Sequence, residues 1–486
     1  MLTTSQEYQN KIIQNVRQFA SKVEIYFDGP NVDPVTFYSD DYVVGMSLLE
    51  EYHTHARNPL GLISSNEISI ILANPGNMFT PTNTNSPYYT KLLPNLLVKP
   101  FIGLVLNWEE EEEVEEYVPE IEYIPLGQFY TGDWMTSGND LQVNIRCTDG
   151  ISKQFNKRML QVPIQENTST KDLFEKLFTV MNIDSSSYEI DESLSTEIRY
   201  GWFEGNQLRE VIQNLANNSC CSVFINRYGK IIVRNNYTVG DPVLVLTDQD
   251  QVISSQAPQK YSKVYSTLDV EHGKPYIGRS TEIFSIHNVG IDQDGIDFKR
   301  GAFRNGPVAV IDHIVIQGSE DVEIDSFSYG AWDFTLRLLN HGPSTDITII
   351  MYGTSIEFTE DVVKVSNEEL VDVIGDKNLS MHPYLVQDES TAVGFGNLLL
   401  GLVSDPIGHI TAEIIGNPAL ELGDTITIQN PTHAMDYLDV VITKLQLQYQ
   451  GGLTCHIEGI SRESRIKFNW VSVSPGMYNL VPQEVS

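Results

Sequence analysis

The sequence predicts a mainly β protein with some α+β character, in which two β domains are joined by a small α/β module. Three observations carry this prediction. Segments in which apolar and polar residues alternate dominate both halves of the 486-residue chain. Two amphipathic stretches of helical period lie together near the middle, at residues 171–181 and 206–217. The 23 tyrosines also favour strands, in which aromatic residues are enriched.

Length and composition predict a folded protein of about three domains. Hydrophobic residues make up 41% of the chain and aromatic residues 10%, which is ample for packed cores. Lys and Arg number 31 against 65 Asp and Glu, so the formal net charge is -34. This excess opposes stable binding to nucleic-acid phosphates and to anionic lipid. A soluble acidic protein is the simple interpretation, although an acidic surface also suits a channel through which DNA passes without adhering.

Cysteines and terminal signals indicate that the protein is made and folds in a cytoplasm. Cys147, Cys220, Cys221 and Cys455 are too few and too scattered for a disulfide framework, so we expect reduced, structural thiols. The N-terminus has no basic region followed by an apolar one, so no secretory signal is visible. No run approaches the roughly 18 apolar residues of a membrane span.

Residues 1–22 predict an amphipathic helix that begins with a capping box of Thr4 and Glu7. Alternation of apolar residues then predicts a first β domain over residues 23–160. In one of its strands, Ile68, Ile70 and Leu72 share a face. The run 74–77, Asn-Pro-Gly-Asn, ends this strand because proline lacks an N–H and glycine permits positive φ.

The rest of the chain continues the mixed pattern. Residues 161–240 predict the α/β module, with its two helices and a hairpin whose strands are 222–226 and 231–234. A second β domain follows, with a helix at 390–403. We expect this domain at 241–317 and 373–465, an inserted β segment at 318–372, and a tail at 466–486.

No residue pattern predicts a catalytic site, a metal site or a cofactor. His53-Thr54-His55 has a spacing that can chelate a metal on a strand, but no cysteine or carboxylate cluster completes it. Gly394-Phe395-Gly396 lacks the third glycine of a dinucleotide loop. The paired acids Asp40-Asp41, Asp191-Glu192 and Glu360-Asp361 fall where solvated loops are expected. Since hydrolase, nucleotide-binding and zinc-protease motifs are also missing, we expect a protein that is not an enzyme.

The acidic run from Glu109 to Glu116 contains seven glutamates in eight residues. Like charges at this density repel and cannot be buried, so we expect a solvated loop without an ordered role. On this interpretation its deletion leaves assembly intact. The alternative is an interaction surface for a basic partner.

Several segments resemble, in the same order along the chain, the tail hub proteins of Gram-positive phages and prophages. The resemblance covers residues 22–240 and 375–465. The matching segments are VTFYSDD at 35–41, GLISSNEISIILAN at 61–74, YIPLGQFYTGDW at 123–134, LREVIQNLA at 208–216 with NRYGK at 226–230, and GNPALELGD at 416–424 with QGGLTC at 450–455.

The resemblance implies two tube-like β-barrels per chain and a homotrimer that forms a pseudo-hexameric ring. Such a hub is a structural virion protein of the tail or baseplate, which joins the tail tube protein to a central spike or tip protein and lets DNA pass. It contacts other baseplate proteins and has no stable nucleic-acid binding, no membrane span and no cofactor. The loop 74–91 then becomes a subunit contact, with Tyr88 and Tyr89 as its candidate residues.

Two other functions stay open at this point. One is a peripheral baseplate or arm protein that anchors receptor-binding fibres. The other is a tail-associated peptidoglycan hydrolase, although the chain shows no recognisable hydrolase segment after its last predicted strand.

Overall fold

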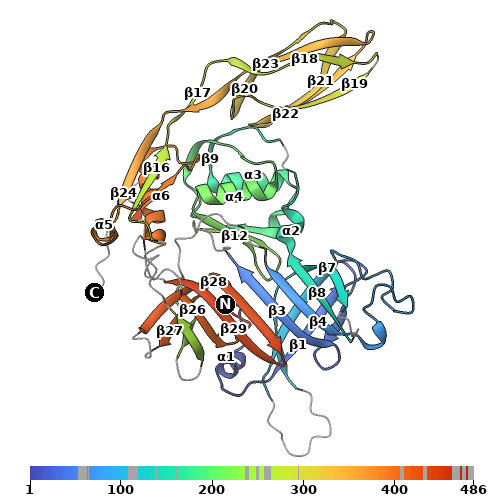
Figure 1. The fold of residues 1–486 in the computed structure, drawn as a ribbon, viewed down its shortest axis with the longest axis vertical. Helices are drawn as coiled ribbons and strands as arrows, with labels where there is room; N and C mark the ends of the chain where they lie inside the picture. The colour runs from blue at the N-terminus through green and yellow to red at the C-terminus, as the bar shows by residue number, and fades with distance from the viewer. Residues whose placement is uncertain are drawn as a thin grey trace, which may run out of the picture.

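A computed structural model places most of the chain (Figure 1). Strands make up most of the regular structure, which confirms a mainly β protein with some helix. The structure describes residues 1–52, 63, 65–107, 119–136, 141–158, 161–235, 240–247, 251–256, 264–293, 295–404, 410–430, 435–461, 471–472 and 478–479.

The first β domain is a curved antiparallel sheet in which the strand order is β3-β4-β8-β7-β5-β1-β2, with β6 also paired to β5. In β4 the side chains of Ile68, Ile70 and Leu72 are buried, as the alternation predicted. The strands are β1 (Phe19–Tyr26), β2 (Val35–Tyr38), β3 (Val43–Glu51), β4 (Glu67–Ala73), β5 (Leu97–Val105), β6 (Ile121–Pro125), β7 (Phe129–Thr136) and β8 (Gln142–Asp149).

The N-terminal helix is shorter than the predicted 1–22. Helix α1 (Gln6–Ile12) begins after Ser5, whose side chain accepts a hydrogen bond from the Tyr8 backbone, so the predicted capping box at Thr4 is wrong. From Phe19 the chain already pairs with β5 and buries every second residue. Pairing with a neighbouring strand satisfies the backbone there, and it outweighs the local helical pattern.

The α/β module lies directly above the first β domain in Figure 1. Its two main helices lie close to their predicted positions, and their apolar sides meet the strands β10, β12 and β13 in one core. A capping box of Ser169 and Asp172 starts α3. The elements are α2 (Gly150–Gln154), β9 (Gln165–Ser169), α3 (Thr170–Val180), β10 (Tyr188–Ile190), β11 (Glu197–Gly201), α4 (Leu208–Asn218), β12 (Cys221–Ile225) and β13 (Ile231–Asn235).

The second β domain shares both a sheet and a core with the first. Strand β28 pairs with β3 from Glu51 opposite Lys444 to Met46 opposite Tyr449, which joins the two domains in one 14-stranded sheet. We call this the joined sheet. The added strands are β14 (Leu244–Leu246), β15 (Val252–Gln256), β26 (Ile410–Ile415), β27 (Thr425–Asn430), β28 (Met435–Gln450) and β29 (Gly452–Ser461).

A small sheet stands apart from the second β domain. Strand β16 (Thr267–His272) lies between β24 (Asp361–Ser366) and β25 (Asn378–Met381), and helix α6 (Glu389–Val403) packs on it. Helix α5 (Glu368–Ile374) lies between β24 and β25 in the chain. Since β24 pairs with β16, residues 361–366 do not belong with the inserted segment that was predicted at 318–372.

Residues 275–358 form a β-sandwich at the far end of the molecule, the distal sandwich (Figure 1). Its two sheets enclose a core around Phe334, Leu336, Ile349 and Met351. Strand β20 pairs with β23, so the unit begins well before residue 318. Its strands are β17 (Pro275–Ile277), β18 (Thr281–Ile291), β19 (Ile296–Ala302), β20 (Val308–Gln317), β21 (Val322–Tyr329), β22 (Asp333–Asn340) and β23 (Thr345–Phe358).

Candidate assembly surface and channel face

The outer face of the joined sheet carries a continuous row of uncharged polar side chains and one arginine. Residues directly opposite one another in the ladder form this row across β29, β28, β3, β4 and β8. Their neighbours along each strand are buried in the shared core, so the row lies on the side away from it. In order across the sheet, the row is Thr454, Gln448, Ser47, Ser69 and Arg146.

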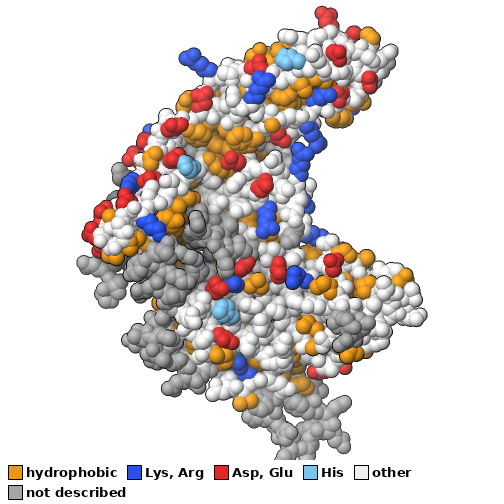
Figure 2. All heavy atoms as spheres, in the orientation of Figure 1, with side chains coloured by type: hydrophobic (Ala, Val, Ile, Leu, Met, Phe, Trp, Pro, Cys, Tyr) orange, Lys and Arg blue, Asp and Glu red, His pale blue; other side chains and the backbone are white. Residues whose placement is uncertain are grey.

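Charge on this face is sparse and partly neutralised. The Lys444 ammonium lies 2.8 Å from a carboxylate oxygen of Glu458 on the neighbouring strand. The Ser69 hydroxyl donates to the Asn144 side-chain oxygen at 2.8 Å. In Figure 2 single acidic, basic and histidine side chains are scattered over the described surface at β28, β29 and β3, whereas acidic side chains gather along the edge at β24 and α5. Glu51 and Glu67 lie on the same side of their strands as Ser47 and Ser69, so acids and bases are both scattered on this face while the row itself is uncharged up to Arg146.

A buried ion pair fastens three parts of the chain together. Arg227 lies in the turn between β12 and β13, and its guanidinium bonds both carboxylate oxygens of Glu50 on β3, at 3.1 and 2.8 Å. The same group donates to the backbone oxygens of Pro418 and Leu420 in the second β domain. Burial opposes the charge, but the attraction of Glu50 outweighs it and keeps the pKa of Arg227 above its ordinary value.

The turn that presents Arg227 is built by local sequence. The side-chain oxygen of Asn226 accepts hydrogen bonds from the backbone of Tyr228 at 3.1 Å and of Lys230 at 2.9 Å. Gly229 adopts φ +81°, which glycine permits at little cost. The sequence predicted the turn but gave no sign of its buried partner.

The predicted contact residues Tyr88 and Tyr89 have different surroundings. The Tyr88 ring stacks on Phe27 and Phe79, with centroid distances of 4.6 and 5.5 Å, so it belongs to an aromatic cluster within the chain. Tyr89 is 43% exposed. The loop around them is fixed by Asn74, whose side chain accepts from the Phe79 backbone at 2.8 Å. Of the two residues, Tyr89 has the ring that is free to meet another subunit.

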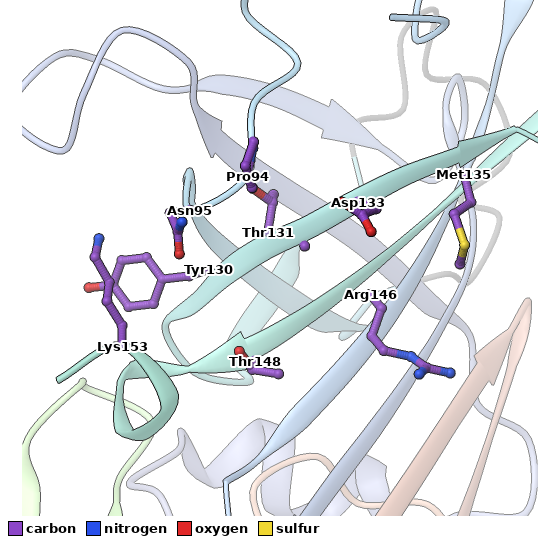
Figure 3. A pocket seen from close by; sticks show the side chains of 10 residues that line it. Pro94, Asn95, Tyr130, Thr131, Asp133, Met135, Arg146, Thr148 and Lys153 are labelled. Atoms are coloured by element: carbon purple, nitrogen blue, oxygen red, sulfur yellow. The ribbon is translucent and has the colours of Figure 1, made fainter. Parts of the chain in front are cut away.

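A pocket of about 440 Å³ opens over two inner strands of the same sheet (Figure 3). Its floor is the paired strands β7 and β8, where a β-bulge lies between Thr131 and Trp134. The Lys153 ammonium lies 4.1 Å from the centre of the Tyr130 ring. Charged lining residues are Arg146, Lys153 and Asp133. We call this the Arg146–Lys153 pocket.

Other groups with potential for chemistry are accounted for by packing. All four cysteines are free and buried, as expected, and burial raises the pKa of the Cys147 thiol to about 12. Gly394 and Gly396 lie inside helix α6, which agrees with a false dinucleotide match. Asp40-Asp41 and Asp191-Glu192 lie in turns or loops, whereas Asp361 is the first residue of β24.

The described residues hold no group of three His, Cys, Asp or Glu that is placed to bind a metal. None of the helices in the described ranges is both long and apolar enough to cross a membrane. The pair His53 and His55 and the acidic run 109–116 lie outside the described residues.

Two solved structures are similar to this chain over nearly its whole length. The first is the 43 kDa tail protein of prophage MuSo2 from Shewanella oneidensis, with a TM-score of 0.51, 8% identity, and coverage of 92% of this chain and 99% of that one. The second is a tail protein from Neisseria meningitidis MC58, with a TM-score of 0.51, 7% identity and the same coverage. No protein-family model and no curated protein matches the sequence. At this identity the likeness concerns the fold.

Proposed function

We propose that this chain is a structural protein of a phage tail, which forms the baseplate or tail-tip hub and surrounds the path of the DNA. The joined sheet is the observation that carries the proposal. It gives one chain two β domains with a shared, nearly neutral outer face, and the fold is similar to that of two tail proteins. We infer that this outer face lines the channel.

The chemistry of the outer face suits passage rather than binding of DNA. Tight binding to a phosphate backbone needs several Lys or Arg side chains, each of which releases counterions. On the row across the sheet Arg146 is the one cation, and nearby Lys444 is already paired with Glu458. Hydroxyl and amide groups bond water or phosphate weakly and interchangeably, so DNA would slide along them.

Three copies of a two-domain chain would place six β domains around one axis. The hub would then match a six-fold tail tube protein on one side and a three-fold spike or tip protein on the other, beside other baseplate proteins. On this proposal the protein resides in the virion and is not an enzyme. Tyr89, on its ordered loop, would meet the neighbouring copy.

Image reconstruction of the particle tests the proposal directly. We expect three copies on the tail axis, with the outer face of the joined sheet toward the DNA. Six or more copies away from the axis would overturn the hub and favour a peripheral arm protein that anchors fibres. Clearing of a cell-wall zymogram by purified protein would instead favour a peptidoglycan hydrolase.

Substitution of Tyr89 tests the subunit contact separately. We expect Tyr89→Ala to weaken oligomerisation in analytical ultracentrifugation while leaving the unfolding temperature unchanged, because its ring is exposed. Tyr88→Ala is the comparison variant, since loss of its stacked ring should lower the stability of the monomer. An unchanged oligomer for Tyr89→Ala would contradict this contact.

A further inference from the structure

The Arg146–Lys153 pocket holds two cations that no carboxylate of the described residues neutralises. Arg146 and Lys153 are both exposed, and no carboxylate lies within ion-pair distance of either one in the part of the chain that the structure describes. Asp133 is the acid of the lining, so the lining carries an excess of one positive charge. In a chain with 65 acidic and 31 basic residues, two cations in one pocket without a carboxylate partner indicate a site for an acidic ligand.

The arrangement of the lining indicates the shape of that partner. In Figure 3 Lys153 and Arg146 lie at different ends of the pocket, with Tyr130 and Thr148 between them. Met135, which is 52% exposed, extends the lining with an apolar side chain. Two separated cations beside apolar groups fit an extended acidic peptide with apolar residues better than a single phosphate, which would engage both cations at one point.

This chain contains a segment of that description. Residues 108–118 read Trp-Glu-Glu-Glu-Glu-Glu-Val-Glu-Glu-Tyr-Val, with carboxylates on both sides of a valine, a tryptophan at the start and a tyrosine next to the last residue. The segment lies outside the described residues, between β5 and β6. Its charge and composition complement those of the pocket.

Backbone reach favours the segment of a second copy over that of the same chain. Strand β5 meets β7 at Leu97, opposite Tyr130, and meets β6 at Val105, opposite Ile121. These ends are eight residues apart, about 26 Å along a strand. Glu113 is six residues from Asn107 and from Pro119, so it extends at most about 20 Å from either. Arg146 lies farther still from the acidic end, beyond Tyr130.

We propose that the Arg146–Lys153 pocket of one copy binds the 108–118 segment of a second copy. The inference rests on the proposed oligomer, because it requires two chains in contact. Such binding removes the unpaired arginine from the outer face of the joined sheet, which leaves that face better suited to DNA passage. It also replaces the expectation that the acidic run has no role.

A labelled peptide of residues 107–119 tests the proposal on the full-length protein. We expect binding in fluorescence anisotropy at low ionic strength, weakened by added salt. The charge-reversal variant R146E/K153E should bind about tenfold more weakly or worse, since each lost ion pair becomes a repulsion. A peptide with every glutamate replaced by glutamine should lose affinity to a similar degree.

The matched control is K176E/K230E, which changes two exposed lysines of the α/β module by the same charge. It should bind the peptide within about twofold of the wild type. Equal binding by the two double variants would overturn the proposal, and so would displacement of the peptide by a short DNA duplex, which would assign the pocket to phosphates. If R146E/K153E does not fold, R146Q/K153Q takes its place, with the same expected loss.

Exchange of charge within the full chain tests the assembled state. Adding E111K/E113K to R146E/K153E should restore self-association in analytical ultracentrifugation, because the ion pairs return with reversed signs. If the variant with all four substitutions does not recover self-association, the proposed binding between copies is contradicted. Antibody labelling of intact particles tests the tail location independently, so the two proposals can fail separately.

Discussion

The joined sheet and the distal sandwich are held to the rest of the chain in different ways. The two β domains of the joined sheet share a strand ladder, a continuous core and the buried ion pair of Arg227. The sandwich meets the α/β module through a small cluster around Trp202, Ala331 and Ile356, and through a hydrogen bond from Ser328 to Gln161. The difference indicates that the joined sheet and the α/β module form one rigid unit, which we call the body, and that the distal sandwich is an accessory unit attached to it.

The connection to the sandwich is also narrow. Only two chain segments enter it, between β16 and β17 and between β23 and β24. They pass so closely that a Cβ atom on Gly273 would lie 1.9 Å from the Thr359 backbone oxygen. Glycine is required there for space. We therefore expect substitutions in the body to change global stability and substitutions at the base of the sandwich to change its attachment.

The largest expected effect comes from Arg227→Met. The change leaves the Glu50 carboxylate buried without its partner, which costs about 3–5 kcal/mol of unfolding free energy. Chemical denaturation measures it. The double variant E50Q/R227M should recover much of the loss, because no unpaired charge is left. A single variant within about 1 kcal/mol of the wild type would show that the ion pair does not hold the domains.

Trp202→Ala should loosen the sandwich without unfolding the body. The Trp202 ring lies 5.0 Å from Tyr384 and 5.7 Å from Phe358, and its removal leaves a cavity worth about 3 kcal/mol at this contact. We expect faster proteolysis near Gly273 and Thr359. Phe298→Ala, on the exposed outer side of the sandwich, is the control and should leave the cleavage rate unchanged. Cleavage of the joined sheet at the same rate would contradict a separate unit.

Asp149 gives the body a pH dependence. Burial raises the pKa of its carboxyl to about 6, although Ser65, Asn66 and Ile151 all donate hydrogen bonds to it. Between about pH 4 and pH 6 the folded protein binds more protons than the unfolded chain, so stability falls as the pH rises. The total change is about 2–3 kcal/mol.

Unfolding titrations across this pH range measure the effect. Asp149→Asn should flatten the curve, since the amide does not titrate. A wild-type curve that rises through the same range would contradict the raised pKa.

The smallest effect on stability is expected for lysines placed on the outer face. The variant S47K/Q448K should stay within about 0.5 kcal/mol of the wild type, because both side chains lie on the surface. It should nevertheless slow DNA release from assembled particles, since two lysines per copy attract phosphates. Q317K/T348K on the distal sandwich is the matched control, since these two residues also lie opposite each other on paired strands. Equal release rates for both variants would contradict a channel along the joined sheet.

Much of the fold could be predicted because it follows from the local spacing of apolar residues. Helices α3 and α4 and the buried side of β4 follow from the spacing of apolar residues alone. The joint between the domains could not be predicted, since the pairing of β3 with β28 connects distant parts of the chain. Arg227 looked like an ordinary turn residue, and only the fold brings Glu50 to it.

The candidate contact residues show the same limit. Tyr88 and Tyr89 are adjacent in the sequence and equally aromatic, yet one ring is stacked within the chain and the other is exposed. Whether a loop side chain turns inward depends on Phe27 and Phe79, which come from other parts of the first domain. The local sequence therefore does not predict which of the two rings is buried.

The ladder between β3 and β28 has a mechanical consequence. Six consecutive residue pairs, backed by a common core, prevent the two β domains from rotating against each other. In a ring built from several such chains, each chain would behave as one rigid subunit. A change in the diameter of the ring would then have to occur at the interfaces between neighbouring copies, because each chain does not bend.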